Sequence, residues 1–546
     1  MSRARAAAFL LVVLTACPGN RVVPPSKTPE TLPPAAGERG GTLRVSLAQD
    51  VDAIDPQRAG APASFGIARA MHRGLMAFPD AGGEDAARPV PDLAEGPPEI
   101  SPDATRYTFK LRAGGRFGAP ASRDIRAADV KAGLERIFTA HSPFAGYFGV
   151  IAGAAAFSAG HATGLSGVAV PDDRTVVITL VRPVNDLLWL LALPAASAVP
   201  PGLAPSARPK DIPPSGPYRL ADDGYIPERS IHLVRNEAWS EATDLVRRAL
   251  VDEIRFDIGR PPADIVRRIA KGSSDLAGDA LPPGIATAGI TADRIVGEPH
   301  GCLRYLFMNT RVAPFGSSRV RAGVAAALDR AAVAATYGPG GAAPAATILP
   351  PTVFGHDAAR VAPSPDPAAA RSLLGGRGFT TRLVVGDTKL DLDQAAAVRT
   401  ALRAAGVRVI VAPVPIASLY EDYYEVPAAK VAMGIASWCA DWPGLGGRGA
   451  LTPLVDGRTL RARGNTNYAG LVDPRIGRAV DAASVERDPA RATAAWLAAD
   501  KQATAAAAVV PLAFPAEISL LGARVRGFAP HPFFVRGDLT ALWIAS

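Results

Sequence analysis

The chain has 546 residues, of which 48% are apolar and 20% charged, and its formal net charge is +8. This length exceeds what one ordinary core holds and predicts two or three lobes, while the apolar content excludes a disordered chain. Eight of the 59 basic residues are lysines and the rest are arginines, scattered singly or in pairs without a stripe of interleaved aromatics. The charge therefore gives no indication of a nucleic-acid partner.

The N-terminus predicts a secretory signal. Arg3 and Arg5 precede an apolar run from Ala6 to Leu14, small residues follow, and the run is too short to span a bilayer. The sequence Leu-Thr-Ala-Cys ending at Cys17 resembles a bacterial lipobox, in which the cysteine is diacylated and becomes the new N-terminus. We expect a signal peptide over 1–16 and a proline-rich tether over 17–39. The alternative is an ordinary signal peptide with an incidental cysteine.

Helices and strands then alternate without a fixed period, which predicts a mixed α/β chain with no internal repeat. Leu43, Val45 and Leu47 alternate in a first strand, and β-branched runs predict further strands over 175–180 and 251–258. Apolar residues at helical spacing predict helices over 127–138, 317–337 and 490–508. The last of these opens on Asp488-Pro489, a helix-start signal.

Motifs of common enzymes are missing from the sequence. HExxH, CxxC, GxSxG and GxxxxGK[ST] do not occur, and "GPGGAAP" (338–344) lacks the Lys and hydroxyl of a phosphate loop. The seven histidines never fall three to five residues apart, so no local metal-ligand pair exists. We therefore predict no catalytic activity, no cofactor and no metal.

Several segments from residue 40 to the C-terminus carry distinctive motifs in a fixed order. An opening strand runs into an Asp-Pro turn in "GGTLRVSLAQDVDAIDPQ", and the longest motif, over 91–130, joins a hairpin to a helix. The others are "MHRGLM" (71–76), "SGPYRL" (215–220), "YLFMNTRVAPFGSSRVRAGVAAALDR" (305–330) and "DPAAARSLLGGRGF" (366–379). Together they resemble the large extracytoplasmic solute-binding proteins of ABC importers, the peptide/nickel-binding family.

The resemblance implies an α/β fold with two lobes joined by crossing strands, and an extra domain inserted in the first lobe. By the order of the motifs, the first lobe comprises 40–74, 200–301 and 515–546. The inserted domain comprises 75–199 and the second lobe 302–514. The ligand is expected between the two lobes, which close over it.

The stretch "IASWCADWPG" (435–444) allows two interpretations. Without the resemblance, Trp438 and Trp442 are core aromatics and Asp441 is a turn residue ahead of Pro443. With it, the stretch resembles the strand end at which oligopeptide-binding members present an aspartate, here Asp441, to the α-ammonium of the ligand. The resemblance then places the ligand against six residues: Ser437, Cys439, Asp441, Trp442, Gly60 and Ala61.

The resemblance also bears on the cysteines and on the kind of ligand. With Cys17 acylated, an even pair remains in an oxidising compartment, and some peptide-binding relatives bond the cysteines that match Cys302 and Cys439. Two free buried thiols are the alternative. The sequence departs from the family at "PGLGGRG" after Trp442, which brings Arg448, and at Ala59, where peptide binders can carry an acidic residue.

These observations predict a monomeric, lipid-anchored, extracytoplasmic receptor of an ABC importer. It would capture peptides or related amine-bearing solutes and deliver them to a permease and its ATPase, without covalent chemistry. A receptor for nickel chelates, opines or sugars fits the same fold. The alternatives outside transport are a peptide-sensing lipoprotein and an extracellular hydrolase.

Overall fold

The computed structural model describes residues 37–545, apart from 283, 284, 286, 300, 377 and 535. The predicted signal peptide, Cys17 and the tether up to residue 36 lie outside the described residues. Within the described part, no helix is both long enough and apolar enough to cross a membrane.

The first lobe is built on a five-stranded sheet in the order β11-β1-β10-β9-β8. Two parallel pairings, of β1 with β10 and β11, adjoin an antiparallel run of β10, β9 and β8. The strands are β1 (Thr42–Ser46), β8 (Tyr218–Ile226), β9 (Ser230–Arg235), β10 (Glu253–Asp257) and β11 (Leu276–Ala277). Leu43, Val45 and Leu47 are buried as their alternation predicts, and they share a core with helix α1 (Pro62–Met71).

The inserted domain carries a four-stranded antiparallel sheet in the order β4-β5-β7-β6. Its strands are β4 (Glu99–Ile100), β5 (Arg106–Lys110), β6 (Val168–Asp172) and β7 (Thr175–Thr179). Val130, Leu134 and Ile137 of α3 (Ala127–Thr139) are buried in the same core, which confirms the helix predicted from their spacing. Two short helices, α4 (Ala145–Phe148) and α6 (Leu187–Leu190), extend from this domain toward the second lobe.

The second lobe holds most of a seven-stranded sheet in the order β12-β18-β13-β17-β15-β16, with β14 paired to β18. The strands are β12 (Ile295–Pro299), β13 (Cys302–Met308), β14 (Ala342–Pro344), β15 (Thr380–Gly386), β16 (Arg408–Val414), β17 (Met433–Cys439) and β18 (Val509–Leu520). Helices cover it, among them α10 (Pro367–Leu373), α11 (Lys389–Ala404), α13 (Gly447–Val455), α14 (Pro474–Val485) and α15 (Pro489–Ala505).

The single helix predicted over 317–337 is wrong, because the segment forms two helices, α8 (Ser318–Ala327) and α9 (Arg330–Ala335). Leu328 and Asp329 leave the helical conformation, and the Asp329 carboxylate accepts a hydrogen bond from the main-chain N–H of Ala332. An aspartate that caps a helix start stabilises the break that separates the two helices.

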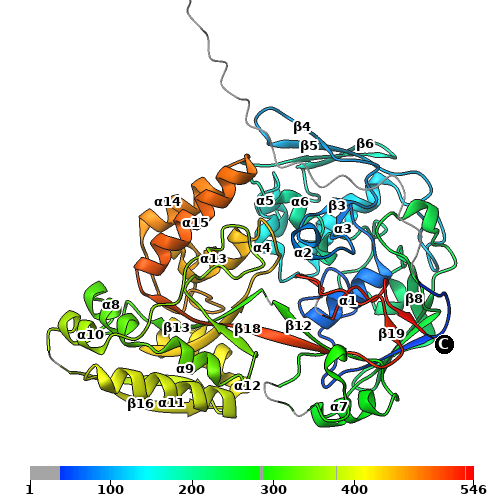
Figure 1. Cartoon of the computed structure of the whole chain (residues 1–546). Coiled ribbons are helices and arrows are strands. Elements are labelled where there is room, and N and C mark those ends of the chain that lie inside the picture. The colour runs from blue at the N-terminus through cyan, green and yellow to red at the C-terminus, as the bar shows by residue number, and fades with distance from the viewer. Residues whose placement is uncertain are drawn as a thin grey trace, which may run out of the picture.

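Two strand connections carry the chain between the lobes, as the two-lobed prediction requires. β18 pairs with β13 and β14 in the second lobe and then, from Ala516 onward, with β12. The chain crosses a second time where β12 leads into β13. Figure 1 shows β18 as the long red arrow between the lobes. The exact lobe boundaries stay a prediction.

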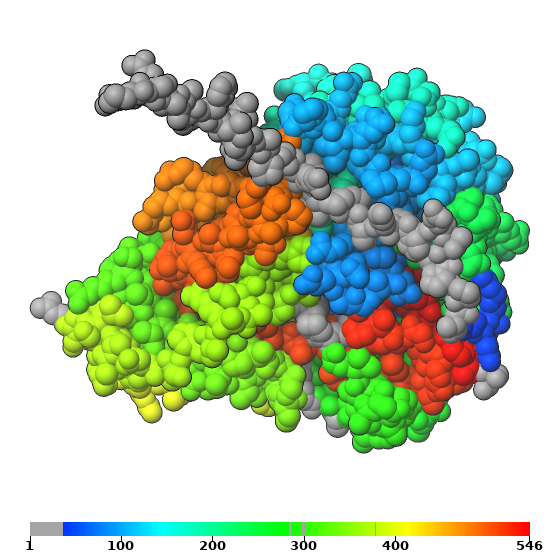
Figure 2. Space-filling view, turned by 45° about the horizontal axis from the view of Figure 1, so that its top comes forward, coloured from blue at the N-terminus to red at the C-terminus, as the bar shows by residue number. Residues whose placement is uncertain are grey.

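The inserted domain packs directly against the second lobe. Asn185 donates from its side chain to the main-chain carbonyls of Ala483 and Glu486 at 2.8 and 2.9 Å. One hydrophobic core contains Trp189 of the inserted domain together with Trp442 and Trp496 of the second lobe. In Figure 2 the orange helices α14 and α15 lie against the blue and cyan surface of the inserted domain. The lobes are therefore in a closed arrangement.

The predicted disulfide between Cys302 and Cys439 is present. These residues are direct partners in the antiparallel register of β13 and β17, with their Cα atoms 3.8 Å apart. The bond therefore fixes the end of β17 to the strand that crosses between the lobes.

We expect the double substitution Cys302→Ser and Cys439→Ser to lower the stability of the second lobe. The bond closes a loop with a sequence separation of 137 residues, which on the chain-entropy model stabilises the fold by about 5 kcal/mol as an upper value. Calorimetry with and without reductant measures the effect. Reductant should lower the melting temperature of the parent to that of the double variant and leave the variant unchanged. If reductant does not lower the melting temperature of the parent protein, the prediction is contradicted.

Candidate functional site

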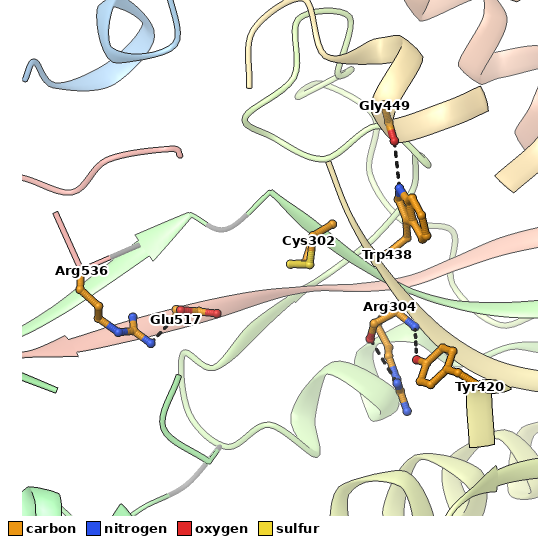
Figure 3. Close-up of a disulfide and its surroundings, with 9 residues drawn as sticks. Cys302, Arg304, Tyr420, Trp438, Gly449, Glu517 and Arg536 are labelled. Atoms are coloured by element: carbon orange, nitrogen blue, oxygen red, sulfur yellow. Dashed lines mark hydrogen bonds and ion pairs between the residues drawn. A yellow bond between two sulfur atoms is a disulfide. The ribbon is translucent and has the colours of Figure 1, made fainter. Parts of the chain in front are cut away.

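The candidate site lies where β17 ends, between the second lobe and the inserted domain. Ala440 donates its main-chain N–H to the carbonyl of Gly301 at 2.7 Å, so the pairing with the crossing strand continues one residue past Cys439. Asp441 follows, and the chain then turns into α13. Figure 3 shows this region around the disulfide, with Trp438 on one side of it and Arg536 and Glu517 on the other.

Asp441 presents a half-buried carboxylate to the inserted domain. Its only described side-chain partner is the Tyr147 hydroxyl of α4, which donates to Oδ2 at 2.5 Å, and no described Arg, Lys or His forms an ion pair with it. Burial raises the pKa of Asp441 to about 7, and the hydrogen bond from Tyr147 opposes part of that rise. The site therefore holds a carboxylate that lacks a cationic protein partner.

Arg448 lies near Asp441, but its positive charge is balanced by Asp186. Its guanidinium makes a buried, two-pronged ion pair with Asp186, with N–O distances of 2.8 and 2.9 Å. It also lies over the rings of Tyr147 and Trp442, 5.5 and 5.8 Å from their centroids. The arginine that departs from the family pattern therefore joins the second lobe to the inserted domain.

Trp442 is fully buried and packs against Tyr147, the residue that donates a hydrogen bond to Asp441. Its ring meets that of Tyr147 edge to face at 4.8 Å, and its indole N–H donates to the carbonyl of Leu445 at 3.1 Å. This packing is what the interpretation as a core aromatic predicts. Direct contact of Trp442 with a ligand stays a prediction.

Ser437 and Cys439 lie on the part of β17 that has no strand on its outer side. β15 pairs with β17 only at Met433 and Gly434, so no described strand pairs with the outer edge from Ile435 onward. The main-chain N–H of Ser437 donates to the Tyr420 hydroxyl at 3.2 Å. Cys439 is exposed.

Arg304 supports this strand from β13. It donates from Nη1 to the Ser437 hydroxyl at 3.2 Å and from Nε to Gln394 at 2.7 Å, and it forms an ion pair with Asp391. Because its charge is balanced inside the second lobe, Arg304 fixes the strand and offers no uncompensated charge to a ligand.

Gly60 and Ala61 lie in the first lobe directly before α1. The N–H of Gly60 donates to Asp52 at 2.7 Å, and a Cβ at Gly60 would come within 3.3 Å of a side-chain carbon of Pro143. The segment from Pro143 to Tyr147 thus touches both Gly60 and Asp441. Ser437, Cys439, Asp441 and Trp442 lie together at the end of β17, and Gly60 lies on the far side of the segment that starts at Pro143. A role of Gly60 and Ala61 in ligand binding stays a prediction.

Sequence reasoning did not find Tyr147, Asp186 or Tyr420. Tyr147 and Asp186 lie 294 and 262 residues from their partners, and no local motif marks either of them. Only Tyr420 had a signal, as one of three tyrosines within "LYEDYY" (419–424).

Comparison with known proteins gives one family. The family model described as bacterial extracellular solute-binding proteins, family 5 Middle, matches residues 88–446. The glutathione-binding protein GsiB of Salmonella typhimurium is 28% identical over 355 residues, which cover 61% of each chain. The periplasmic oligopeptide-binding protein OppA of Escherichia coli is 26% identical over 330 residues, 58% of this chain and 57% of its own. The chain thus spans about three fifths of the length of these curated relatives.

Solved structures match over nearly the whole chain. The clavulanic acid biosynthesis oligopeptide binding protein 2 has a TM-score of 0.84 and 27% identity, covering 97% of this chain and 100% of its own. The periplasmic binding protein DppA from Helicobacter pylori, solved with the peptide STSA, has a TM-score of 0.73 and 19% identity, covering 93% and 99%. The second match shows the fold alone.

We expect Asp186→Asn to destabilise the contact between the inserted domain and the second lobe. The substitution keeps the shape but leaves the Arg448 guanidinium buried beside a neutral amide, which typically costs about 3–5 kcal/mol. Denaturant unfolding measures the loss. The control is the paired variant Asp186→Leu with Arg448→Met, which removes both charges and should recover most of the stability. Equal stability of the parent and Asp186→Asn would argue against a buried ion pair.

Proposed function

The chain belongs to the bacterial extracellular solute-binding proteins of family 5, and we propose that it captures peptides or related amine-bearing solutes between its two lobes and delivers them to a permease. Glutathione and oligopeptides, which the names of two relatives give as ligands, both carry a free amino group. Binding and release account for such a role without covalent chemistry.

The observation that carries this proposal is the carboxylate of Asp441. An enclosed charge without a counter-charge is costly, and Asp441 has a hydroxyl but no cation beside it among the described residues. A ligand ammonium would supply the missing charge. The open edge of β17 leads directly to this carboxylate and offers main-chain groups to a peptide.

We also propose the location and the partners predicted from the sequence. Acylation of Cys17 would tether the protein to the outer face of the membrane. There it would act as a monomer that passes its ligand to an ABC permease with its ATPase. Support comes from the lipobox-like Leu-Thr-Ala-Cys and from membership in an extracellular family.

Asp441→Asn should weaken ligand binding by roughly two to three orders of magnitude or more. The amide keeps the shape of the side chain but leaves an enclosed ammonium without its charge partner, which typically costs about 3–5 kcal/mol. Calorimetric titration with a pool of short peptides, and with the same pool after N-acetylation, measures the effect. Acetylation should harm binding to the parent far more than binding to the variant.

The matched control for this experiment is Asp422→Asn, which removes an exposed carboxylate from the same lobe and should leave affinity unchanged. If the parent binds free and acetylated peptides equally well, Asp441 is not an ammonium receptor. If it binds no peptide at all, the proposed ligand class is wrong.

Affinity for a peptide should fall as the pH falls below 7. The raised pKa of Asp441, about 7, means that the carboxyl group gains a proton over this range, whereas a peptide ammonium stays charged there. A cationic ligand needs the ionised form, so affinity should drop roughly tenfold between pH 7.0 and 5.5. Titrations of the parent and of Asp441→Asn in one buffer series test this. A slope that persists in the variant would assign the pH dependence to another group.

A further inference from the structure

The outer edge of β17 shows which main-chain groups a ligand can reach. Since the N–H of Ser437 points to Tyr420, and the N–H of Ala440 points to the opposite side toward Gly301, alternate residues face outward. The outward-facing residues after Gly434 are therefore Ile435, Ser437, Cys439 and Asp441.

Two tyrosine hydroxyls occupy the first part of this edge. The Tyr424 hydroxyl lies 2.7 Å from the carbonyl oxygen of Val384 and 3.2 Å from that of Ile435, at the point where β15 separates from β17. The Tyr420 hydroxyl accepts the next hydrogen bond, from the N–H of Ser437. In Figure 3 the Tyr420 ring points its hydroxyl at the strand that carries Trp438.

A rare helical turn holds both tyrosines in place. They belong to the π-helical segment η5 (Leu419–Tyr424), in which the N–H of Glu425 bonds to the carbonyl of Tyr420, five residues back. The two rings pack edge to face at 5.4 Å. Single π-helical turns are rare and are frequently found at functional sites. Tyr420 therefore occupies the N–H of Ser437, which a longer ligand strand would need for pairing.

The remaining edge fits a short ligand. Among the described residues, none forms a hydrogen bond with the carbonyl of Ser437 or with the N–H or carbonyl of Cys439. A first ligand residue opposite Cys439 can exchange two hydrogen bonds with it and direct its ammonium toward Asp441, the next outward-facing residue. In an antiparallel pairing the third ligand residue lies opposite Ser437. Its carbonyl would need the N–H that Tyr420 already holds.

We propose that Tyr420 limits the ligand to two residues, so that the receptor is specific for dipeptides or amine-bearing solutes of that length. This inference rests on the proposed function. A hydroxyl can accept one hydrogen bond and donate another, and no described acceptor is assigned to the Tyr420 proton. That proton is available to the carboxylate at the end of a two-residue ligand.

Peptide pools of two, three and four residues, with free termini and mixed side chains, test the proposal by calorimetric titration. The parent should bind the two-residue pool at least roughly tenfold more tightly than the four-residue pool, because a longer peptide displaces a hydrogen bond and a packed ring. Tyr420→Ala should open the edge and reduce or reverse this preference.

Tyr420→Phe separates the two roles of the side chain, because it keeps the ring but loses the hydroxyl. It should weaken the two-residue pool severalfold and relax the discrimination against longer peptides only in part, because the N–H of Ser437 is freed while the ring still covers the edge. The matched control is Tyr423→Phe, a half-buried tyrosine of the same turn, which should change neither affinity nor preference. Circular dichroism and melting temperature check that each variant folds, and Tyr420→Phe keeps the test valid if Tyr420→Ala does not.

The outcomes separate this inference from the proposed function. If the parent binds four-residue peptides as tightly as two-residue ones, and Asp441→Asn weakens both alike, the length limit is wrong and the ammonium site stands. If no pool binds the parent, the proposed function is wrong and the length limit with it.

Discussion

The candidate site depends on the early separation of β15 from β17. Were β15 to follow its neighbour to the end, the main-chain groups of Ser437 and Cys439 would be paired inside the sheet. Pairing stops at Gly434 instead, and the disulfide to β13 holds the free half of β17 in place from its inner side. An unpaired edge in a rigid strand is a ready template for another chain. Here the edge ends beside Asp441 at the contact between the second lobe and the inserted domain.

The charged side chains near this edge differ in whether they have a partner of opposite charge. Arg448 is balanced by Asp186, Arg304 by Asp391, and Arg536 by Glu517 at 2.8 Å. Of the described charges at the site, Asp441 is the one met by a hydroxyl alone. Buried pairs of opposite charge fix geometry without attracting a ligand, since each guanidinium already has its carboxylate. This distribution of charge supports the proposal that the surface recognises the cationic end of a ligand.

Much of the fold was predictable because it follows local patterns. Alternation predicted the strand around Val45 and helical spacing predicted α3, whereas the two-lobed arrangement came from the resemblance to the solute-binding family. The break at Asp329 was missed because the alanine-rich pattern favours one continuous helix, although an aspartate there is a known helix-start signal. The site was predicted only as far as the strand that carries Asp441.

The partners of that strand could not be predicted, because they come from turns and helices distant in sequence. No periodicity places Tyr147 on Asp441 or Asp186 on Arg448. The three tyrosines of 419–424 stand out in the sequence, but they do not predict a π-helical turn that aims Tyr420 at a main-chain N–H.

The contact between Tyr147 and Asp441 explains how the closed lobes tolerate a carboxylate without a cation. Burial raises the pKa of Asp441 to about 7 and so favours the protonated carboxyl group, while the hydrogen bond from Tyr147 stabilises the ionised form. In the binding mode that we propose, an ammonium beside Asp441 would lower the pKa of the carboxyl group, so that ligand capture would be linked to proton release. Because Tyr147 belongs to the inserted domain and Asp441 to the second lobe, the same hydrogen bond connects the charge state of the site to the contact between the two.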